Sequence, residues 1–373
     1  MKNVLITGGA GFIGFNLTKR LIDCGYNITI LDNLSKKIHS SNIKYTKLKD
    51  ITHFIIGDVC NRADWEKAIS NQDVIIHLAA ETGTGQSMYD IHNYTNINVG
   101  GTALMLDVLT NSKNSIKKII LSSSRAVYGE GMYECKEQGV VVPPPRNDED
   151  LKDAKYDFIS QHSKSKLIPL PTKENSHILP TSIYALTKYN QEQILLLAAK
   201  NLNIDVAILR YQNVFGPGQS LSNPYTGILS VFSTRILNGN DIEIYEDGMQ
   251  SRDFVYIDDV VNATLLVLKK SNLKNQVYNV GSGEPITVLK VAQKLKELYN
   301  LTASITISNK YRRGDIRHNF ADLSLINQEL GFVNEFSFDS GLLNFVEWVK
   351  KQDIQYDKYD SSIQEMIQKG IMK

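Results

Sequence analysis

The chain has 373 residues, of which 22% are charged and 42% apolar, and its formal net charge is +1. This balance argues against nucleic acid or a membrane surface as a partner, and the length predicts a large core divided between two lobes. Three cysteines, Cys24, Cys60 and Cys135, lie far apart without a CxxC pair, so neither a metal site nor a disulfide framework is expected.

The first apolar run is too short for a signal peptide, and no run reaches the length of a membrane span, which predicts a soluble cytoplasmic protein. Short Val/Ile/Leu runs alternate with helical patterns through the first half of the chain. Such runs are typical of a parallel sheet buried on both faces, so we expect a doubly wound α/β (Rossmann) fold. Its ligand should bind beyond the carboxyl ends of the strands. The expected strands are 4–6, 28–31, 54–56, 74–78, 119–121 and 206–209.

The chain is expected to divide into unequal parts. Residues 1–200 are predicted to form a dinucleotide-binding domain, and residues 201–350 mainly a smaller C-terminal α/β substrate-binding lobe that is partly interleaved with the first. Residues 351–373 form a polar tail that we expect to fray or dock weakly. A charged, proline-containing insertion at about 131–173 shows little periodicity, and we interpret it as either a lid or a surface excursion.

A glycine-rich turn follows the first expected strand and opens a helix. Gly8, Gly11 and Gly14 allow a tight turn, close packing of helix on strand, and the approach of backbone N–H groups to a pyrophosphate. The strand before the turn and the helix after it make this pattern a strong indication of a dinucleotide site.

Two acidic residues follow the next two strands. Asp32 lies 18 residues beyond Gly14, where a carboxylate accepts from the adenosine ribose hydroxyls and repels a 2′-phosphate, which favours NAD over NADP. The neighbouring Lys36 and Lys37 either accommodate such a phosphate or are exposed loop charges. Asp58 either accepts from the adenine amino group or caps its turn.

Tyr184 and Lys188 are separated by one helical turn and so share one face of a helix. A phenol has a pKa of about 10, and a nearby ammonium together with a positively charged nicotinamide lowers it, so Tyr184 can act as a base near neutral pH. Tyr45 and Lys49 have the same spacing, but they precede the third strand, away from the carboxyl edge.

Ser124 follows the strand 119–121 and is expected to hydrogen-bond the same substrate oxygen as Tyr184. Ser123 is the alternative, because adjacent residues of a strand face opposite ways. The alternative interpretation of the serine triplet 122–124 is that it only caps the next turn. Together, the glycine turn and the Tyr/Lys/Ser group predict an enzyme that transfers hydride.

These residues resemble the extended short-chain dehydrogenase/reductase family over almost the whole chain. The resemblance implies a nucleotide-sugar substrate, tightly held NAD, and a homodimer formed through the helix that bears Tyr184. It is carried by the segments 7–14, 77–80, 122–124, 184–188, 210–217 and 252–255.

The resemblance also implies roles for individual residues. Lys188 holds the cofactor ribose, and two arginines neutralise the diphosphate, although a single arginine of this kind is equally often part of a surface ion pair. The expected cofactor contacts are Gly8, Gly11, Phe12, Ile13, Gly14, Asp32, Asn33, Asp58, Val59, Leu78, Ala79, Ala80, Asn98 and Lys188. The expected substrate contacts are Thr82, Ser124, Arg125, Tyr184, Asn213, Arg252 and Arg313.

Within this family, dehydratases carry an Asp-Glu pair directly after the strand-end Ser or Thr, whereas this chain has Arg125 and Ala126 there. We therefore expect C4 epimerisation through a 4-keto sugar, with Ser124 steadying the substrate oxygen. The segments 81–89, 124–131 and 313–318 resemble dTDP-L-rhamnose 4-epimerases, which make dTDP-6-deoxy-L-talose.

Several alternatives stay open. UDP-galactose or UDP-N-acetylhexosamine is an alternative substrate, and a nucleotide-sugar 4-ketoreductase is an alternative enzyme. A regulatory protein that senses dinucleotide is an alternative of another class. By analogy alone, the resemblance places the enzyme in polysaccharide or O-antigen synthesis.

Overall fold

The computed structural model describes residues 2–36, 43–225, 227–273 and 275–373. A seven-stranded parallel sheet forms its centre, with the strand order β13-β9-β5-β4-β1-β2-β3, which confirms the predicted doubly wound fold. The strands are β1 (Asn3–Thr7), β2 (Asn27–Asp32), β3 (His53–Ile56), β4 (Val74–His77), β5 (Lys118–Ser124), β9 (Asp205–Tyr211) and β13 (Gln276–Val280).

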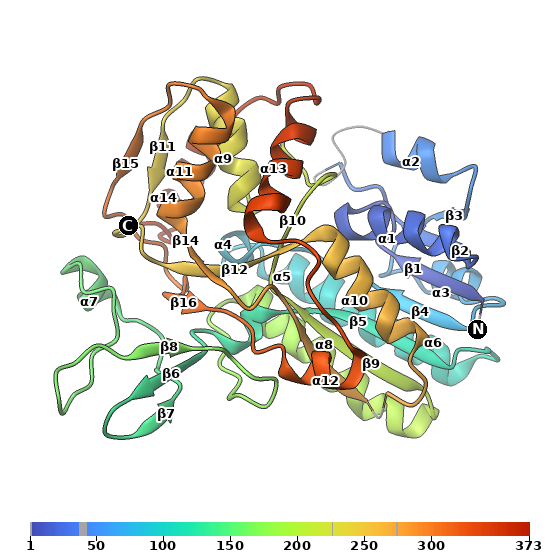
Figure 1. The fold of residues 1–373 in the computed structure, drawn as a ribbon. Helices are drawn as coiled ribbons and strands as arrows, with labels where there is room; N and C mark the ends of the chain where they lie inside the picture. The colour runs from blue at the N-terminus through green and yellow to red at the C-terminus, as the bar shows by residue number, and fades with distance from the viewer. Residues whose placement is uncertain (1, 37–42, 226, 274) are drawn as a thin grey trace.

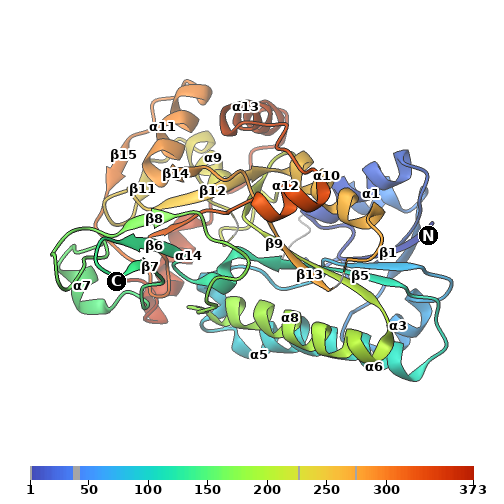
Figure 2. The same cartoon turned by 60° about the horizontal axis from the view of Figure 1, so that its bottom comes forward.

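Helices cover both faces of this sheet (Figures 1 and 2). Successive side chains of a strand point to opposite faces, so in β1 Val4 and Ile6 join one core cluster and Leu5 joins the other. One face carries α1 (Phe12–Asp23), α10 (Ile257–Lys269) and α12 (Ser324–Leu330), and the other carries α3 (Arg62–Ala68), α6 (Gly101–Asn111) and α8 (Ile183–Leu202). The shorter helices of this half are α2 (Ile43–Leu48), α4 (Thr84–Ser87), α5 (Ile91–Tyr94), the π-helix 95–100 and the 3₁₀ helix 125–128.

The second lobe lies beside the carboxyl edge of the sheet. Its first half contains β10 (Asn213–Phe215), α9 (Ile228–Leu237), β11 (Ile242–Ile244) and β12 (Ser251–Tyr256). Its second half contains β14 (Pro285–Thr287), α11 (Val288–Tyr299), β15 (Ile305–Ile307), β16 (His318–Asn319) and α13 (Phe338–Val349). The chain returns to the central sheet through α10 and β13 between these two halves, so the two lobes are interleaved.

The insertion contains regular structure that its weak periodicity does not predict. It forms a three-stranded antiparallel sheet with the strand order β7-β6-β8, and α7 (Asp148–Lys152) lies between β7 and β8 in the chain. The insertion projects from one end of the molecule (Figure 1). The strands are β6 (Met132–Cys135), β7 (Gly139–Val141) and β8 (Ile168–Leu170).

The C-terminal segment differs from the expected loosely attached tail. It forms α14 (Tyr359–Gln368), and Ile363, Met366 and Met372 are buried in an apolar cluster with Tyr245 of the second lobe. The prediction relied on the polar composition of 351–373 and overlooked the apolar spacing within α14.

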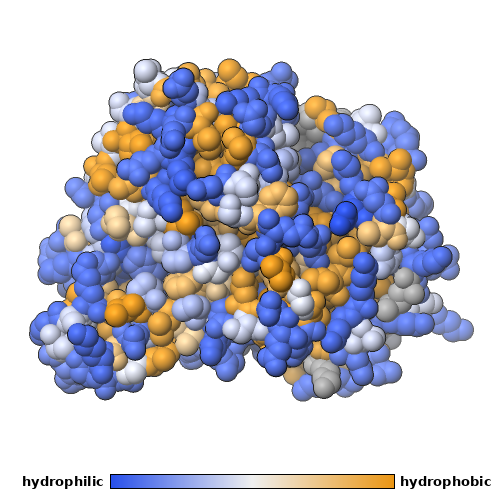
Figure 3. All heavy atoms as spheres, in the orientation of Figure 1, coloured by the Kyte–Doolittle hydropathy of each residue, from blue (hydrophilic) through white to orange (hydrophobic). Residues whose placement is uncertain are grey.

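The surface carries apolar residues in several separate groups, with hydrophilic residues between them, on the face shown in Figure 3. Within the described ranges, no helix combines the length and the apolar character that crossing a membrane requires.

Candidate active site

Among the described residues, a continuous cavity of about 570 Å³ runs along the carboxyl ends of the central strands and continues into the second lobe. The chain order of the sheet reverses between β1 and β4, which is where doubly wound sheets bind their ligands. The cavity wall combines the glycine turn, the Tyr184 region, a group of arginines and part of α14.

The glycine turn has the geometry that its sequence predicts. Gly8 has a φ of +69°, and a Cβ there would lie 2.9 Å from the backbone N of Ala79. A Cβ at Gly14 would lie 2.4 Å from the carbonyl O of Gly8, so the helix start packs directly on the turn. A side chain at either position would collide with this backbone, so the tight turn requires glycine at both. The turn lines the cavity, where its backbone N–H groups are open to a ligand.

Asp32 ends β2 and lines the cavity beside Asn33. Its carboxylate accepts from the backbone N of Ala10 at 3.0 Å and from that of Leu34 at 2.9 Å. The backbone of the glycine turn is thereby tied to the acidic residue that is expected to select the ribose.

Asp58 does not line the cavity. Its carboxylate accepts from the Cys60 backbone N at 2.8 Å and from the Asn33 side chain at 3.0 Å. This arrangement shows the turn-capping role, and the adenine contact stays a prediction. Lys36 is exposed, and Lys37 lies outside the described residues.

The structure places Asn98 behind the cavity wall rather than on it. Asn98 is fully buried, its Oδ1 accepts from the backbone N of Glu81 at 2.8 Å, and its Nδ2 donates to Thr187 at 3.0 Å. It therefore holds the loop after β4 against α8. The other expected cofactor residues line the cavity: Gly8, Gly11, Phe12, Ile13, Gly14, Val59, Leu78, Ala79, Ala80 and Lys188.

These features fit a dinucleotide. The glycine turn, which has no room for a Cβ at Gly8 or Gly14, suits a pyrophosphate, and a buried carboxylate at the end of β2 suits a ribose diol without a 2′-phosphate.

Tyr184 lies in the first turn of α8, where Ser182 caps the helix by accepting from the backbone N of Ala185 at 3.2 Å. Its side chain and that of Ser124 line the same cavity, close enough for Ser124 to affect the pKa of Tyr184 by hydrogen bonding. Ser123 instead donates to the buried Glu192. The structure thus places Ser124, and not the alternative Ser123, against Tyr184.

Burial raises the pKa of Tyr184, while the hydrogen bond with Ser124 and the positive charge of Arg125 act to lower it. Burial also lowers the pKa of Lys188 to about 7, with Glu192 acting in the opposite direction. The side chains of the pocket therefore do not supply the lowered phenol pKa that the sequence predicts. Burial outweighs them, and the remaining contribution in that prediction is the positive nicotinamide of the cofactor.

Three arginines line the far part of the cavity: Arg125, Arg252 and Arg312. Asp315 bridges two of them, accepting from Arg252 and from Arg312 at 2.9 Å each. Burial opposes ionisation of Asp315, yet Arg312 and Arg252 hold its pKa well below the usual range. Burial and the repulsion of Arg252 lower the pKa of Arg125 to about 9. This group thus sets three arginines against the single carboxylate of Asp315, which suits an anionic part of a ligand.

The predicted contact Arg313 points away from the cavity. It is exposed and forms an ion pair with Asp148 of the insertion, whereas its neighbour Arg312 lines the pocket. Arg312 forms an antiparallel β-bridge with Met372, and successive side chains of such an extended segment face opposite sides. The expected substrate contact was therefore placed one residue too far along the chain.

Thr82 and Asn213 line the same cavity. The Oδ1 atom of Asn213 is buried and makes no hydrogen bond within the described part of the chain. A buried acceptor without a partner is costly, so this atom is suited to a ligand donor.

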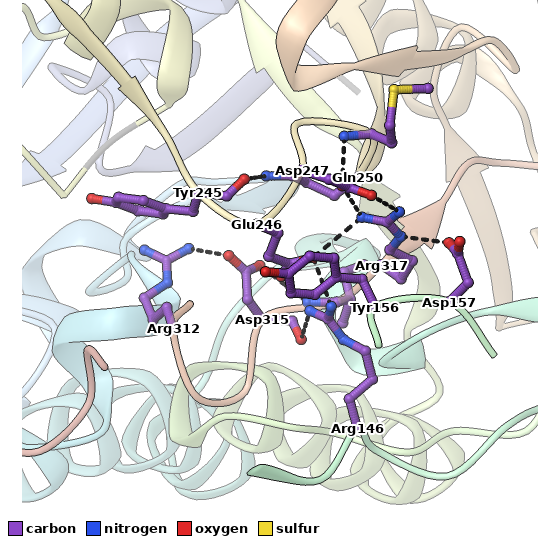
Figure 4. A network of polar contacts seen from close by, with 12 residues as sticks. Arg146, Tyr156, Asp157, Tyr245, Glu246, Asp247, Gln250, Arg312, Asp315 and Arg317 are labelled. Carbon is purple, nitrogen blue, oxygen red and sulfur yellow. Dashed lines mark hydrogen bonds and ion pairs between the residues drawn. The ribbon is translucent and has the colours of Figure 1, made fainter. Parts of the chain in front are cut away.

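The insertion is joined to the arginine group by a buried ionic network (Figure 4). Arg146 donates to Glu246 at 2.8 Å and to the carbonyl O of Asp315 at 2.9 Å. Arg317 pairs with Asp157 of the insertion at 2.9 Å. These contacts fix the insertion to the loop that carries the pocket arginines.

Sequence reasoning missed several cavity residues. Arg312 was missed because the adjacent Arg313 was chosen, and Glu81 was missed although the segment 81–89 carries part of the resemblance. The others come from segments without a recognisable motif: Glu243, Tyr245, Tyr359, Ile363 and Met366.

The model of the NAD dependent epimerase/dehydratase family matches residues 4–281. A dTDP-L-rhamnose 4-epimerase from Burkholderia thailandensis is 34% identical, with 94% of this chain and 96% of that protein aligned. A putative UDP-glucose 4-epimerase from Methanocaldococcus jannaschii is 31% identical over 94% of this chain and 99% of its own length.

Solved structures of nucleotide-sugar 4-epimerases have a similar fold. A UDP-N-acetylglucosamine 4-epimerase from Methanobrevibacter ruminantium, in complex with UDP-N-acetylmuramic acid, has a TM-score of 0.76 and 31% identity, covering 94% of this chain and 99% of that one. A UDP-glucuronic acid 4-epimerase from Bacillus cereus, in complex with UDP-glucuronic acid and NAD, has a TM-score of 0.77 and 25% identity, with the same coverage.

The fold and the site define an NAD-dependent enzyme of the short-chain dehydrogenase/reductase type. The chain belongs to the NAD-dependent epimerase/dehydratase family.

Proposed function

We propose that the protein inverts C4 of a nucleotide-diphosphate sugar through a 4-keto sugar. The observation that carries this proposal is the continuity of one cavity. The glycine cradle, Tyr184 with Ser124, and the arginine pair Arg252 and Arg312 all line it. An acid-base group, a dinucleotide cradle and cations for a diphosphate are the parts that this reaction needs.

Tyr184 takes the proton of the C4 hydroxyl and later returns it to the C4 oxygen. Ser124 holds that oxygen as its charge changes, which its hydrogen bond to Tyr184 supports. NAD, when bound, supplies the hydride acceptor at C4 and the hydride donor for re-reduction. Lys188 lies one turn from Tyr184 on the same cavity wall, where it holds the cofactor ribose.

Arg252 and Arg312 bind the diphosphate, whose charge is about −2. Anchoring the substrate at this distant group leaves the sugar free to turn. The 4-keto sugar can then present its other face, so that hydride returns with inversion. Arg125 and Ala126 stand where an elimination would need carboxylates, which favours epimerisation over dehydration.

Among substrates we favour dTDP-L-rhamnose, converted to dTDP-6-deoxy-L-talose. The 34% identity to the Burkholderia enzyme supports this choice. UDP-sugar epimerases are similar to this chain to almost the same degree, so UDP-galactose and UDP-N-acetylhexosamines are the alternative substrates.

We also propose a cytoplasmic homodimer that acts in polysaccharide or O-antigen synthesis. The long helix α8 supports the dimer, because Leu186 and Leu197 on it are 44% and 66% exposed. Helix α6 lies alongside α8 on the same face (Figure 2). The test is the mass of the purified protein by light scattering, for which we expect twice that of one chain.

The reaction is tested by incubating the purified holoprotein with dTDP-L-rhamnose, UDP-galactose and UDP-N-acetylgalactosamine, each without added cofactor. We expect sustained C4 inversion of one of them, read by NMR. A 4-ketoreductase would instead give no inversion without added cofactor. It would oxidise C4 of its sugar only with added NAD or NADP, which would be reduced stoichiometrically. Binding without turnover, and unchanged cellular function of a Tyr184→Phe variant, would favour the regulatory alternative.

A further inference from the structure

A nucleotide sugar is a linear molecule in which the diphosphate separates the sugar from the nucleoside. In the proposed function the sugar lies at Tyr184 and the diphosphate at Arg252 and Arg312. The nucleoside must then occupy the part of the cavity beyond the arginines.

That part of the cavity is bounded by the C-terminal segment. Tyr245 and Tyr359 lie close enough to Arg312 to interact with its charge, and Figure 4 shows Tyr245 beside Arg312. The Sδ atom of Met366 and the Cδ atom of Arg312 both lie next to Gly85, 3.3 and 3.4 Å from where a Cβ would be. Helix α14 thus directly adjoins the proposed diphosphate position.

Helix α14 presents a mainly apolar surface to this end of the cavity, formed by Tyr359, Ser362, Ile363 and Met366. Contacts with the second lobe fix this surface. The hydroxyls of Tyr245 and Tyr359 lie 2.5 Å apart, and the guanidinium of Arg235 lies 4.3 Å from the centre of the Tyr359 ring.

The last residues of the chain hold the backbone on both sides of Arg312. Tyr311 and Lys373 exchange two backbone hydrogen bonds of 2.9 and 3.0 Å, and the N of Arg313 donates to Ile371 at 2.9 Å. The Lys373 ammonium also pairs with Asp148 of the insertion at 2.7 Å. The same segment therefore borders the cavity and positions one of its cations.

We propose that helix α14 is the wall of the nucleoside end of the substrate pocket and selects the base. This inference rests on the proposed function. An apolar wall beside a fixed cation suits a pyrimidine nucleoside diphosphate, since the planar base packs on the wall and the phosphates meet Arg312.

The test compares two isoleucines of α14. Ile363 is 5% exposed and lines the cavity, whereas Ile367 is 44% exposed on the outer side of the helix. UDP and dTDP are titrated calorimetrically into the holoprotein and into Ile363→Ala and Ile367→Ala, with NAD content as the control for folding. We expect Ile363→Ala to weaken both ligands on the order of tenfold, because it removes methylene groups from the pocket, and Ile367→Ala to bind as the parent does.

A second variant separates recognition of the base from general loosening. Met366→Leu conserves side-chain volume, so the fold is retained. We expect it to change the ratio of UDP to dTDP affinity, which a merely structural role would leave constant. An unchanged ratio, together with equal binding by Ile363→Ala and Ile367→Ala, overturns the inference.

The outcomes also separate this inference from the proposed function. If UDP or dTDP binds and its affinity changes in the α14 variants while no sugar is inverted, the role of α14 is supported and the proposed C4 reaction is refuted. If the parent binds neither nucleotide, both fail.

Discussion

The two ends of the cavity are built in different ways. The cofactor end is made from short segments that each follow a strand of one sheet, such as the turn at Gly8 and the carboxylate of Asp32. The substrate end is assembled from the second lobe, the insertion and the C-terminal segment, which meet around Arg312. Motifs can describe the first end because its geometry is local. The second end depends on contacts between distant segments.

The largest expected effect lies between the two ends, at Tyr184. Tyr184→Phe removes the proton acceptor, so the rate of C4 inversion should fall on the order of 10²- to 10⁴-fold. NAD content should not change, because the glycine cradle is intact. Tyr45→Phe is the matched control, since Tyr45 has the same Tyr-x-x-x-Lys spacing but packs edge-on against Phe54 at 4.9 Å. Equal losses in the two variants would remove Tyr184 from the mechanism.

The next effect sharpens the assignment at the substrate end. Arg312→Met should weaken binding of the nucleotide sugar roughly tenfold to hundredfold, because a charge-assisted hydrogen bond to the diphosphate is lost. Arg313→Met should have little effect, since its partner is Asp148 at the surface. Titration of UDP and dTDP checks the pair, and a larger loss in Arg313→Met would restore the prediction from sequence.

The insertion should influence the substrate end alone. Arg146 is buried, and Arg146→Met leaves Glu246 without its closest partner. We expect a stability loss of about 3–5 kcal/mol and a several-fold rise in the KM of the nucleotide sugar, with NAD retention unchanged. Lys155→Met, at an exposed ion pair of the same insertion, is the control. Loss of NAD in step with loss of substrate affinity would show that Arg146 acts on the whole fold.

The smallest effect concerns stability at the cofactor end. His77 is buried between Thr7 and Thr102, and burial, aided by the charge of Lys188, lowers the pKa of His77 to about 3. The unfolded chain therefore takes up a proton below about pH 6.5 that the native chain excludes down to about pH 3. The free energy of unfolding should fall as the pH is lowered through this window.

Urea unfolding at several pH values measures this slope. His77→Asn should reduce it, whereas His53→Asn, at an exposed position, should not. An unchanged slope in His77→Asn would assign the acid sensitivity to another group.

The sequence predicted the parallel sheet, the glycine cradle and the Tyr184 position because each is encoded within a few neighbouring residues. It did not predict that β13 completes the central sheet, since this strand lies beyond the point where the strand–helix alternation breaks down. Nor could it choose between Arg312 and Arg313, because the choice depends on which side of an extended segment faces the cavity.

Other differences from expectation have a similar cause. Asp58 follows an expected strand and Asn98 lies in the π-helix 95–100, and both make hydrogen bonds within the protein. The polar composition of 351–373 suggested a loose tail, whereas the few apolar residues of α14 are spaced to dock on Tyr245 and line the cavity. Long-range packing decided each of these positions.

The most direct test of the central claim follows deuterium placed at C4 of the substrate that the holoprotein inverts. The label leaves C4 and returns to the opposite face of the same carbon within one cavity. We therefore predict an inverted product that retains the deuterium at C4 without added cofactor. Loss of the label to water, or its replacement by hydrogen from added NADH, would contradict the account.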